Sequence, residues 1–122
     1  MTGSRSITET LERSSAPWQP HLVAQVNSTD VKLVNLLGEF VWHTHPESDE
    51  LFLVLHGHLT IELRDGNVEL GPNELFVVPR GIEHRPRADA EVHALLVEAA
   101  GTVNTGDAGG DLTAELHDAR SA

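Results

Sequence analysis

The chain has 122 residues, a formal net charge of −11 with neutral histidines, and no cysteine. This length predicts one domain with a single hydrophobic core, and the missing cysteines exclude disulfides and thiolate chemistry. An acidic surface repels phosphate backbones and anionic lipid, so we expect no nucleic-acid or membrane partner. No apolar run approaches the about 18 residues of a membrane span, and the start lacks the basic-then-apolar pattern of a signal peptide. We therefore expect a cytoplasmic protein.

The first 20 residues are polar and are predicted to form an N-terminal arm (residues 1–20). Ser6 and Glu9 have the spacing of a capping box, which predicts a short helix that ends near Arg13. A loosely held arm without this helix is the alternative.

From residue 21 to residue 100, short runs rich in valine and leucine alternate with turn signals, which predicts an all-β domain. Asp65-Gly66 lies between two such runs and is a strong hairpin signal. The wholly apolar run 51–55 predicts a strand that is buried on both faces. The predicted strands cover residues 21–26, 31–37, 40–45, 51–55, 58–63, 68–70, 75–78 and 92–97.

Residues 101–122 are predicted to form a flexible C-terminal tail. Four glycines fall within residues 101–111, and large apolar side chains are almost missing there. Residues 112–120 have the weak pattern of a terminal helix.

Three histidines and one carboxylate are the candidate ligands of a single metal ion. Residues two apart on a strand point to the same face, so His43 and His45 are expected to aim at one side of the strand 40–45. Pro46 ends that strand, and a short loop brings Glu50 to the start of the next one. A carboxylate would then lie beside two imidazoles.

The third histidine, His84, follows Pro79-Arg80-Gly81. The proline ends a strand and the glycine permits a backbone shape that other residues resist, so the chain can turn back and aim His84 at the same cavity. Each of these residues alone has an ordinary structural explanation, but their combined spacing predicts a metal site. Three imidazoles and one carboxylate leave one or two positions open on a five- or six-coordinate ion, as a catalytic site requires.

These residues also carry a family resemblance. His43-Thr44-His45…Glu50, flanked by Gly38 and Gly57, and the later Pro79-Arg80-Gly81…His84 resemble the two signature motifs of the cupin superfamily. The resemblance covers about residues 31–97. It implies a cupin barrel (a double-stranded β-helix, or jelly roll) with short irregular N- and C-terminal extensions, and it implies metal ligation by His43, His45, Glu50 and His84.

Three positions depart from the usual motifs. Four residues instead of five separate Gly38 from His43, Asn73 stands at a turn that normally holds glycine, and Ala88 replaces the asparagine that often closes the second motif. Asparagine tolerates a left-handed backbone, so we expect the turn at Asn73 to survive.

The chain is similar to short single-domain bacterial cupins of the mannose-6-phosphate isomerase-like group. A sugar phosphate needs cationic groups to hold its dianion, and this acidic chain has few near the motifs. Arg85 and Arg87 follow His84 at alternate positions. They would either line the rim of the site or balance Glu83 and Asp89 as solvated charges, and the second interpretation is the one we favour.

The other histidines carry weaker signals. His56 and His58 imitate the ligand spacing, but Gly57 breaks the alternation between them, which predicts two surface residues. His93 lies on the last predicted strand. It is either a proton carrier facing the cavity or a partly buried structural histidine, and we favour the structural role.

Nitrogen and oxygen ligands without sulfur suit one divalent transition metal per chain: Fe, Mn, Zn, Ni, Co or Cu. The resemblance together with this ligand set implies a metal-binding small cupin, which we expect to be a metal-dependent enzyme of the dioxygenase or isomerase type that acts on a small polar or carbonyl-containing molecule. No catalytic acid or base can be named. A non-catalytic metal-containing sensor that binds a small molecule is the alternative, and a structural barrel with vestigial ligands is a third. Small cupins commonly dimerise, so the resemblance implies a homodimer.

Overall fold

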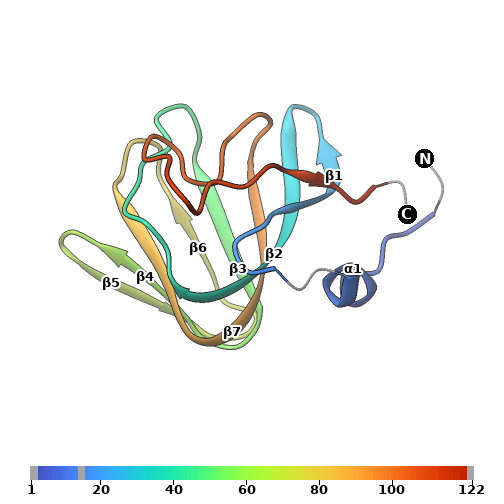
Figure 1. Cartoon of the computed structure of the whole chain (residues 1–122), viewed down its shortest axis with the longest axis horizontal. Coiled ribbons are helices and arrows are strands. Elements are labelled where there is room, and N and C mark those ends of the chain that lie inside the picture. The colour runs from blue at the N-terminus through green and yellow to red at the C-terminus, as the bar shows by residue number, and fades with distance from the viewer. Residues whose placement is uncertain (1–2, 14–15, 121–122) are drawn as a thin grey trace.

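The computed structural model describes residues 3–13 and 16–120. The order of its elements is α1 (Ile7–Arg13), β1 (His21–Val26), β2 (Thr29–Glu39), β3 (Glu50–His56), β4 (Leu59–Leu63), β5 (Gly66–Leu70), β6 (Leu75–Val78), β7 (His84–Ala99) and β8 (His117–Asp118). The strands curl into a barrel, and α1 lies to one side of it (Figure 1). In the described residues no helix is long and apolar enough to cross a membrane.

The helix α1 begins where the capping box predicts. Ser6 Oγ accepts a hydrogen bond from the backbone N–H of Glu9 at 3.2 Å, which satisfies one of the free donors of the first turn. The helix ends at Arg13, as expected.

The longest strand, β7, organises the barrel. One of its edges pairs with β2 along almost the whole length. Its other edge pairs with β4 in the first half, residues 84–87, and with β3 in the second half, residues 93–98. The hairpin of β4 and β5 closes at Leu63 and Gly66, so the prediction from Asp65-Gly66 is confirmed.

The hydrophobic core fills the inside of the barrel. Alternate residues of β3 and β7 are fully buried and face this core, among them Phe52, Val54, Val92 and Leu96. The intervening residues of β3 (Leu51, Leu53 and Leu55) are only partly buried. The prediction that this strand is buried on both faces is therefore wrong for the chain as described, because its outer face is not fully covered.

Two predicted elements differ in the structure. The run 40–45 is not a strand: β2 ends at Glu39, and the chain up to Asp49 makes one isolated bridge, between His43 and His84. The weak terminal helix at residues 112–120 is absent, and β8 pairs there with β1 in parallel. In both places the backbone hydrogen bonds go to distant segments, and residue pattern alone does not show this.

Candidate metal centre

The segment 40–49 is held by backbone hydrogen bonds to the start of β7 and to the loop before it. Phe40 N–H donates to the carbonyl of Pro86, and His43 exchanges two hydrogen bonds of 3.0 Å with the backbone of His84. The carbonyl of His45 accepts a hydrogen bond from Gly81 N–H at 3.0 Å. Gly81 has a φ of +79°, a left-handed value that favours glycine. The first residue of β7 thus holds the backbone of His43, and the loop before β7 holds that of His45.

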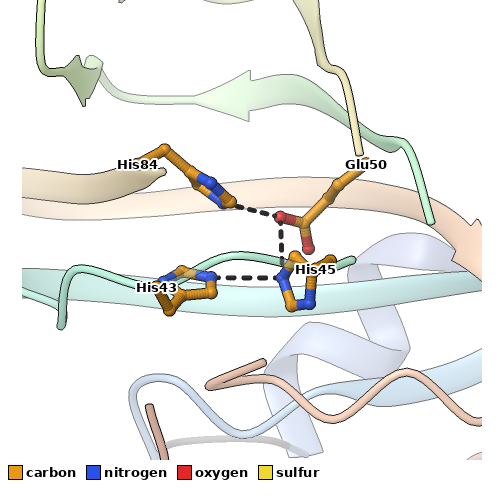
Figure 2. A group of neighbouring side chains, drawn as sticks. All are labelled: His43, His45, Glu50 and His84. Carbon is orange, nitrogen blue, oxygen red and sulfur yellow. Dashed lines mark hydrogen bonds and ion pairs between the residues drawn. The ribbon is translucent and has the colours of Figure 1, made fainter. Parts of the chain in front are cut away.

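Glu50 and His84 are the first residues of β3 and β7. Glu50 and His84 point toward each other from these two strands, with His43 and His45 beside them (Figure 2). All four side chains are buried, and one nitrogen or oxygen atom of each lies within 4.8 Å of the corresponding atoms of the others. The structure therefore brings together the whole predicted ligand set.

The ring nitrogens are oriented for metal binding. Nδ1 of His43 lies 2.8 Å from the carbonyl of Val41, and Nδ1 of His84 lies 3.0 Å from the carbonyl of Ile82. A carbonyl can only accept, so in each neutral ring the hydrogen is on Nδ1 and the lone pair is on Nε2. Such backbone bonds to the outer nitrogen are typical of metal-binding histidines.

The Nε2 atoms of His84 and His43 face the other two candidate ligands. Nε2 of His84 lies 3.1 Å from Oε1 of Glu50, and Nε2 of His43 lies 3.1 Å from Nε2 of His45. With its hydrogen on Nδ1, a neutral His84 ring presents a lone pair to a carboxylate, which is repulsive unless a proton or a metal cation lies between them. Ligands about 2.1 Å from an ion are about 3.0–3.4 Å apart in octahedral or tetrahedral geometry. The spacing of these atoms fits a divalent ion.

The electrostatics of the group favour the protonation states that a metal needs. Burial, and after it the nearby His84, lowers the pKa of His43 to about 4, so this ring is neutral at pH 7. Burial by itself raises the pKa of Glu50, but the imidazoles of His45 and His84 outweigh it and hold the pKa below its ordinary value. The carboxylate is thus ionised and the imidazole of His43 is a free base.

A second buried carboxyl lies beside the group, and sequence analysis missed it. Glu98 of β7 pairs with Glu50 of β3 across the sheet. Its Oε2 accepts a hydrogen bond of 2.7 Å from Nζ of Lys32, and both side chains are almost fully buried. Burial, and after it the charge of Glu50, raises the pKa of Glu98 to about 9. The sequence did hold a signal for Glu98: it lies two residues after Leu96, at the same alternate positions of β7 that face inward.

A small cavity of about 30 Å³ lies next to His43 and Glu50. Its wall is mainly apolar, with rings from Trp18, Phe40 and Phe52, and Glu98 is its further acidic residue. A cavity of this size holds one or two water-sized groups. Among the described residues that line it there is neither arginine nor lysine.

The other histidines lie away from the group. His56 and His58 are exposed, as expected. His93 projects from the outer face of β7, where its ring lies 5.0 Å from that of His56 and 3.1 Å from Oε1 of Glu91. The structural role favoured for His93 agrees with this position.

The two arginines after His84 form ion pairs at the surface. Arg85 pairs with Glu62 at 2.6 Å and with Glu39 at 2.9 Å. Arg87 lies 3.9 Å from Asp89, as the charge-balancing interpretation expects. Neither guanidinium lines the cavity.

Comparison with solved structures places this architecture among known proteins. A cupin-2 domain containing protein from Shewanella frigidimarina is 37% identical, with a TM-score of 0.76 over 78% of this chain and 93% of that chain. A Neisseria meningitidis protein is 28% identical, with a TM-score of 0.73 over 80% and 100%. The fold also resembles that of a hydroquinone 1,2-dioxygenase in complex with Cd²⁺, at 17% identity and a TM-score of 0.65 over 75% and 70%.

Sequence comparison gives the same family. The uncharacterized protein YdbB of Bacillus subtilis is 40% identical over 77 residues, which are 62% of this chain and 68% of that protein. A germin-like protein of Arabidopsis thaliana is 31% identical over 72 residues, and the match spans only 32% of its length. The model of the Cupin domain family matches residues 34–99, which hold all four candidate ligands. The chain belongs to the cupin superfamily.

Proposed function

We propose that this cupin binds one divalent transition metal through His43, His45, Glu50 and His84, and that it is a metal-dependent enzyme for a small molecule. The observation that carries the proposal is the 3.1 Å approach of His84 Nε2 to Glu50 Oε1, with the His84 hydrogen committed to the carbonyl of Ile82. A buried cation resolves this opposition of acceptors. Fe, Mn, Zn, Ni, Co and Cu all suit the ligand set.

A divalent ion in this position supplies Lewis-acid polarisation of a substrate oxygen, or a place for dioxygen if the ion is iron. The residues around the ion supply charge balance and an apolar cavity. The carboxylate of Glu50 offsets the charge of the ion, and the rings of Trp18, Phe40 and Phe52 exclude water from the cavity. Among the described residues, Glu98 and Asn104 are the polar residues of the cavity wall that are not proposed ligands.

The substrate we propose is small, polar or carbonyl-containing, and uncharged. The cavity wall offers a phosphate no arginine or lysine among the described residues, and a dianion needs such partners. The proposal therefore does not extend to sugar phosphates or to a mannose-6-phosphate isomerase activity.

A non-catalytic sensor with the same metal is the second candidate, because the cavity of about 30 Å³ has room for little more than two water-sized groups. Dioxygen uptake by the iron-loaded protein, measured with diketones, catechols and thiols, separates the two. Uptake that depends on one of these compounds supports a dioxygenase, and the zinc- or manganese-loaded protein tests isomerisation of hydroxy-carbonyl compounds by NMR. Binding with no product from any compound contradicts the enzyme and supports the sensor.

We also propose a homodimer that packs through the outer face of β6, β3 and β7. Leu53 pairs with Leu75 on one side and with Leu95 on the other, and Leu51 lies in the same way between Val77 and Val97. Leu75 and Val77 are 58% and 41% exposed. The chain has a net charge of −11, so most contacts between two copies would be opposed by charge repulsion. This face is apolar and uncharged, so two copies can pack there without bringing like charges together.

A further inference from the structure

Asp107 binds the backbone of the residue between the two neighbouring histidines. The N–H of Thr44 donates to Oδ1 of Asp107 at 2.8 Å. The N–H of Asp107 in turn donates to the carbonyl of Thr44 at 3.1 Å. One residue of the C-terminal segment thus satisfies both backbone groups of Thr44.

Thr44 lies between two candidate ligands, so its backbone conformation sets how their side chains are oriented. Its neighbours His43 and His45 both contribute Nε2, and these atoms are 3.1 Å apart. The segment is not part of a strand, so no regular ladder fixes its dihedral angles. The backbone of His43 is held by His84 and that of His45 by Gly81. Asp107 supplies the third attachment, in the middle.

Gly106 makes this close approach possible. It has a φ of +54°, and a Cβ at this position would overlap the carbonyl oxygen of Thr44 and lie 3.1 Å from Nδ1 of His45. A glycine is therefore required where the C-terminal segment passes over the two histidines.

The C-terminal segment is itself anchored, so it can hold Thr44 in place. Nδ2 of Asn104 donates to the carbonyls of Trp18 and Leu112, and its Oδ1 accepts from Ala114 N–H. Thr105 is fully buried and its hydroxyl lies 2.6 Å from that of Thr113. Figure 1 shows the segment crossing one end of the barrel before β8 pairs with β1.

From this geometry we propose that Asp107 is a positioning residue of the metal centre. It holds Thr44 so that the imidazoles of His43 and His45 converge on one ion. Asp107 lies outside residues 34–99, the part that matches the Cupin domain. The inference rests on the proposed metal site, and it makes the C-terminal segment part of that site.

The test compares Co²⁺ binding by the full-length wild type and by three variants. Competition with a chelator measures the dissociation constant, and visible absorption reports the coordination of the ion. Asp107→Ala removes the acceptor for Thr44 N–H and is expected to weaken binding about 10-fold, at the low end of what loss of a direct hydrogen-bond partner of a ligand costs. Asp107→Asn keeps an oxygen acceptor and should stay within about threefold of wild type. Asp111→Ala, at an exposed residue of the same segment, is the matched control and should change nothing.

Asp107→Ala that binds Co²⁺ like wild type, with an unchanged spectrum, overturns the inference and leaves the metal site intact. Asp107→Asn that is as weak as Asp107→Ala also overturns it, because the charge and not the hydrogen bond would then matter. Exchange of the Thr44 amide proton, followed by NMR in the wild type, is independent of any variant. Slow exchange supports the attachment, and exchange at the rate of an open amide refutes it. Wild type that binds no Co²⁺ refutes the proposed function, and the inference with it.

Discussion

Lys32 and Glu98 form a buried pair next to the candidate ligand Glu50. The contact joins Nζ of Lys32 and Oε2 of Glu98 at 2.7 Å, and Nζ also donates to the carbonyl of Thr102 at 3.3 Å. Burial and the charge of Glu50 raise the pKa of Glu98, whereas the pKa of Glu50 is lowered, so Glu98 is the carboxyl of the two that takes up a proton more readily. The pair thus adds a polar group to a cavity whose wall is mainly apolar.

Breaking this pair should destabilise the protein far more than replacing it. We expect Lys32→Met to lower the free energy of unfolding by about 3 kcal/mol, since it leaves a buried carboxyl without its donor. The double variant Lys32→Met, Glu98→Leu should recover most of that loss. Urea unfolding measures both. Arg64→Met, which breaks an exposed ion pair with Glu83, is the control and should cost less than about 1 kcal/mol. Equal losses in the single and double variants would contradict this account.

The contribution of His43 to the stability of the metal-free protein should fall as the pH is lowered from about 6.5 to about 4, while the raised pKa of Glu98 acts in the opposite direction. The pKa of His43 is about 4 in the folded protein, below its ordinary value of 6.5. In this interval the unfolded chain binds a proton that the folded chain does not, so acid favours unfolding. The contribution is at most about 3 kcal/mol, is fully present above about pH 6.5 and is lost by about pH 4. Urea unfolding of wild type and His43→Gln at several pH values checks this, because the variant should lack that part of the slope. The same slope in both proteins would refute the assignment.

Comparison of the predicted and observed strands shows which strand bounds can be predicted from the residue pattern. Residues 21–26 and 75–78 form strands with the predicted bounds, because runs of valine and leucine end there at turn residues. By contrast, β7 begins at His84, eight residues before the predicted start at 92. Pro86 and the charged residues around it are poor strand formers. Pairing with β2 and β4 outweighs this preference, and such tertiary pairing is invisible in a local pattern.

The candidate ligands were predictable because they lie in two short sequence motifs, and their surroundings were not. The pattern of His43, His45, Glu50 and His84 identifies the group, although His43 and His45 converge without the strand that was used to argue for it. Lys32, Glu98 and Asp107 lie outside the two motifs and reach the site only through folding. The two sequence expectations for residues 101–122, a flexible tail and a weak helix, gave no sign that this stretch crosses the barrel end.

The turn between β3 and β4 depends on Gly57. Its φ is +90°, and a Cβ there would lie 2.7 Å from the carbonyl oxygen of Glu91 and 3.0 Å from Cγ2 of Val92. We expect Gly57→Ala to lower the free energy of unfolding by about 2 kcal/mol or more, through backbone strain together with the clash. Gly101→Ala is the matched control, because Gly101 has a φ of +88° with open space around it. Thermal unfolding should show a smaller loss for Gly101→Ala, and equal losses would show that strain alone acts.

The proposed homodimer belongs to the scale of the whole molecule. Wild type should have twice the chain mass of 13.3 kDa in light scattering after size exclusion. Leu75→Glu places a charge on the proposed interface and should give a monomer, since burial of an unpaired carboxylate is costly. Ile82→Glu changes an apolar residue that is 44% exposed elsewhere, and it should leave the mass unchanged. A wild-type monomer, or a Leu75→Glu dimer, would contradict the proposal.

The central claim is that one cation binds where the barrel brings three imidazoles and a carboxylate together. Anomalous diffraction from crystals of the metal-loaded protein tests this most directly. The account predicts one strong peak per chain, about 2.0–2.3 Å from Nε2 of His43, His45 and His84 and from a carboxylate oxygen of Glu50. A peak only at the exposed His56 or His58 or at the partly buried His93, or no peak among the four side chains at full metal loading, would contradict it.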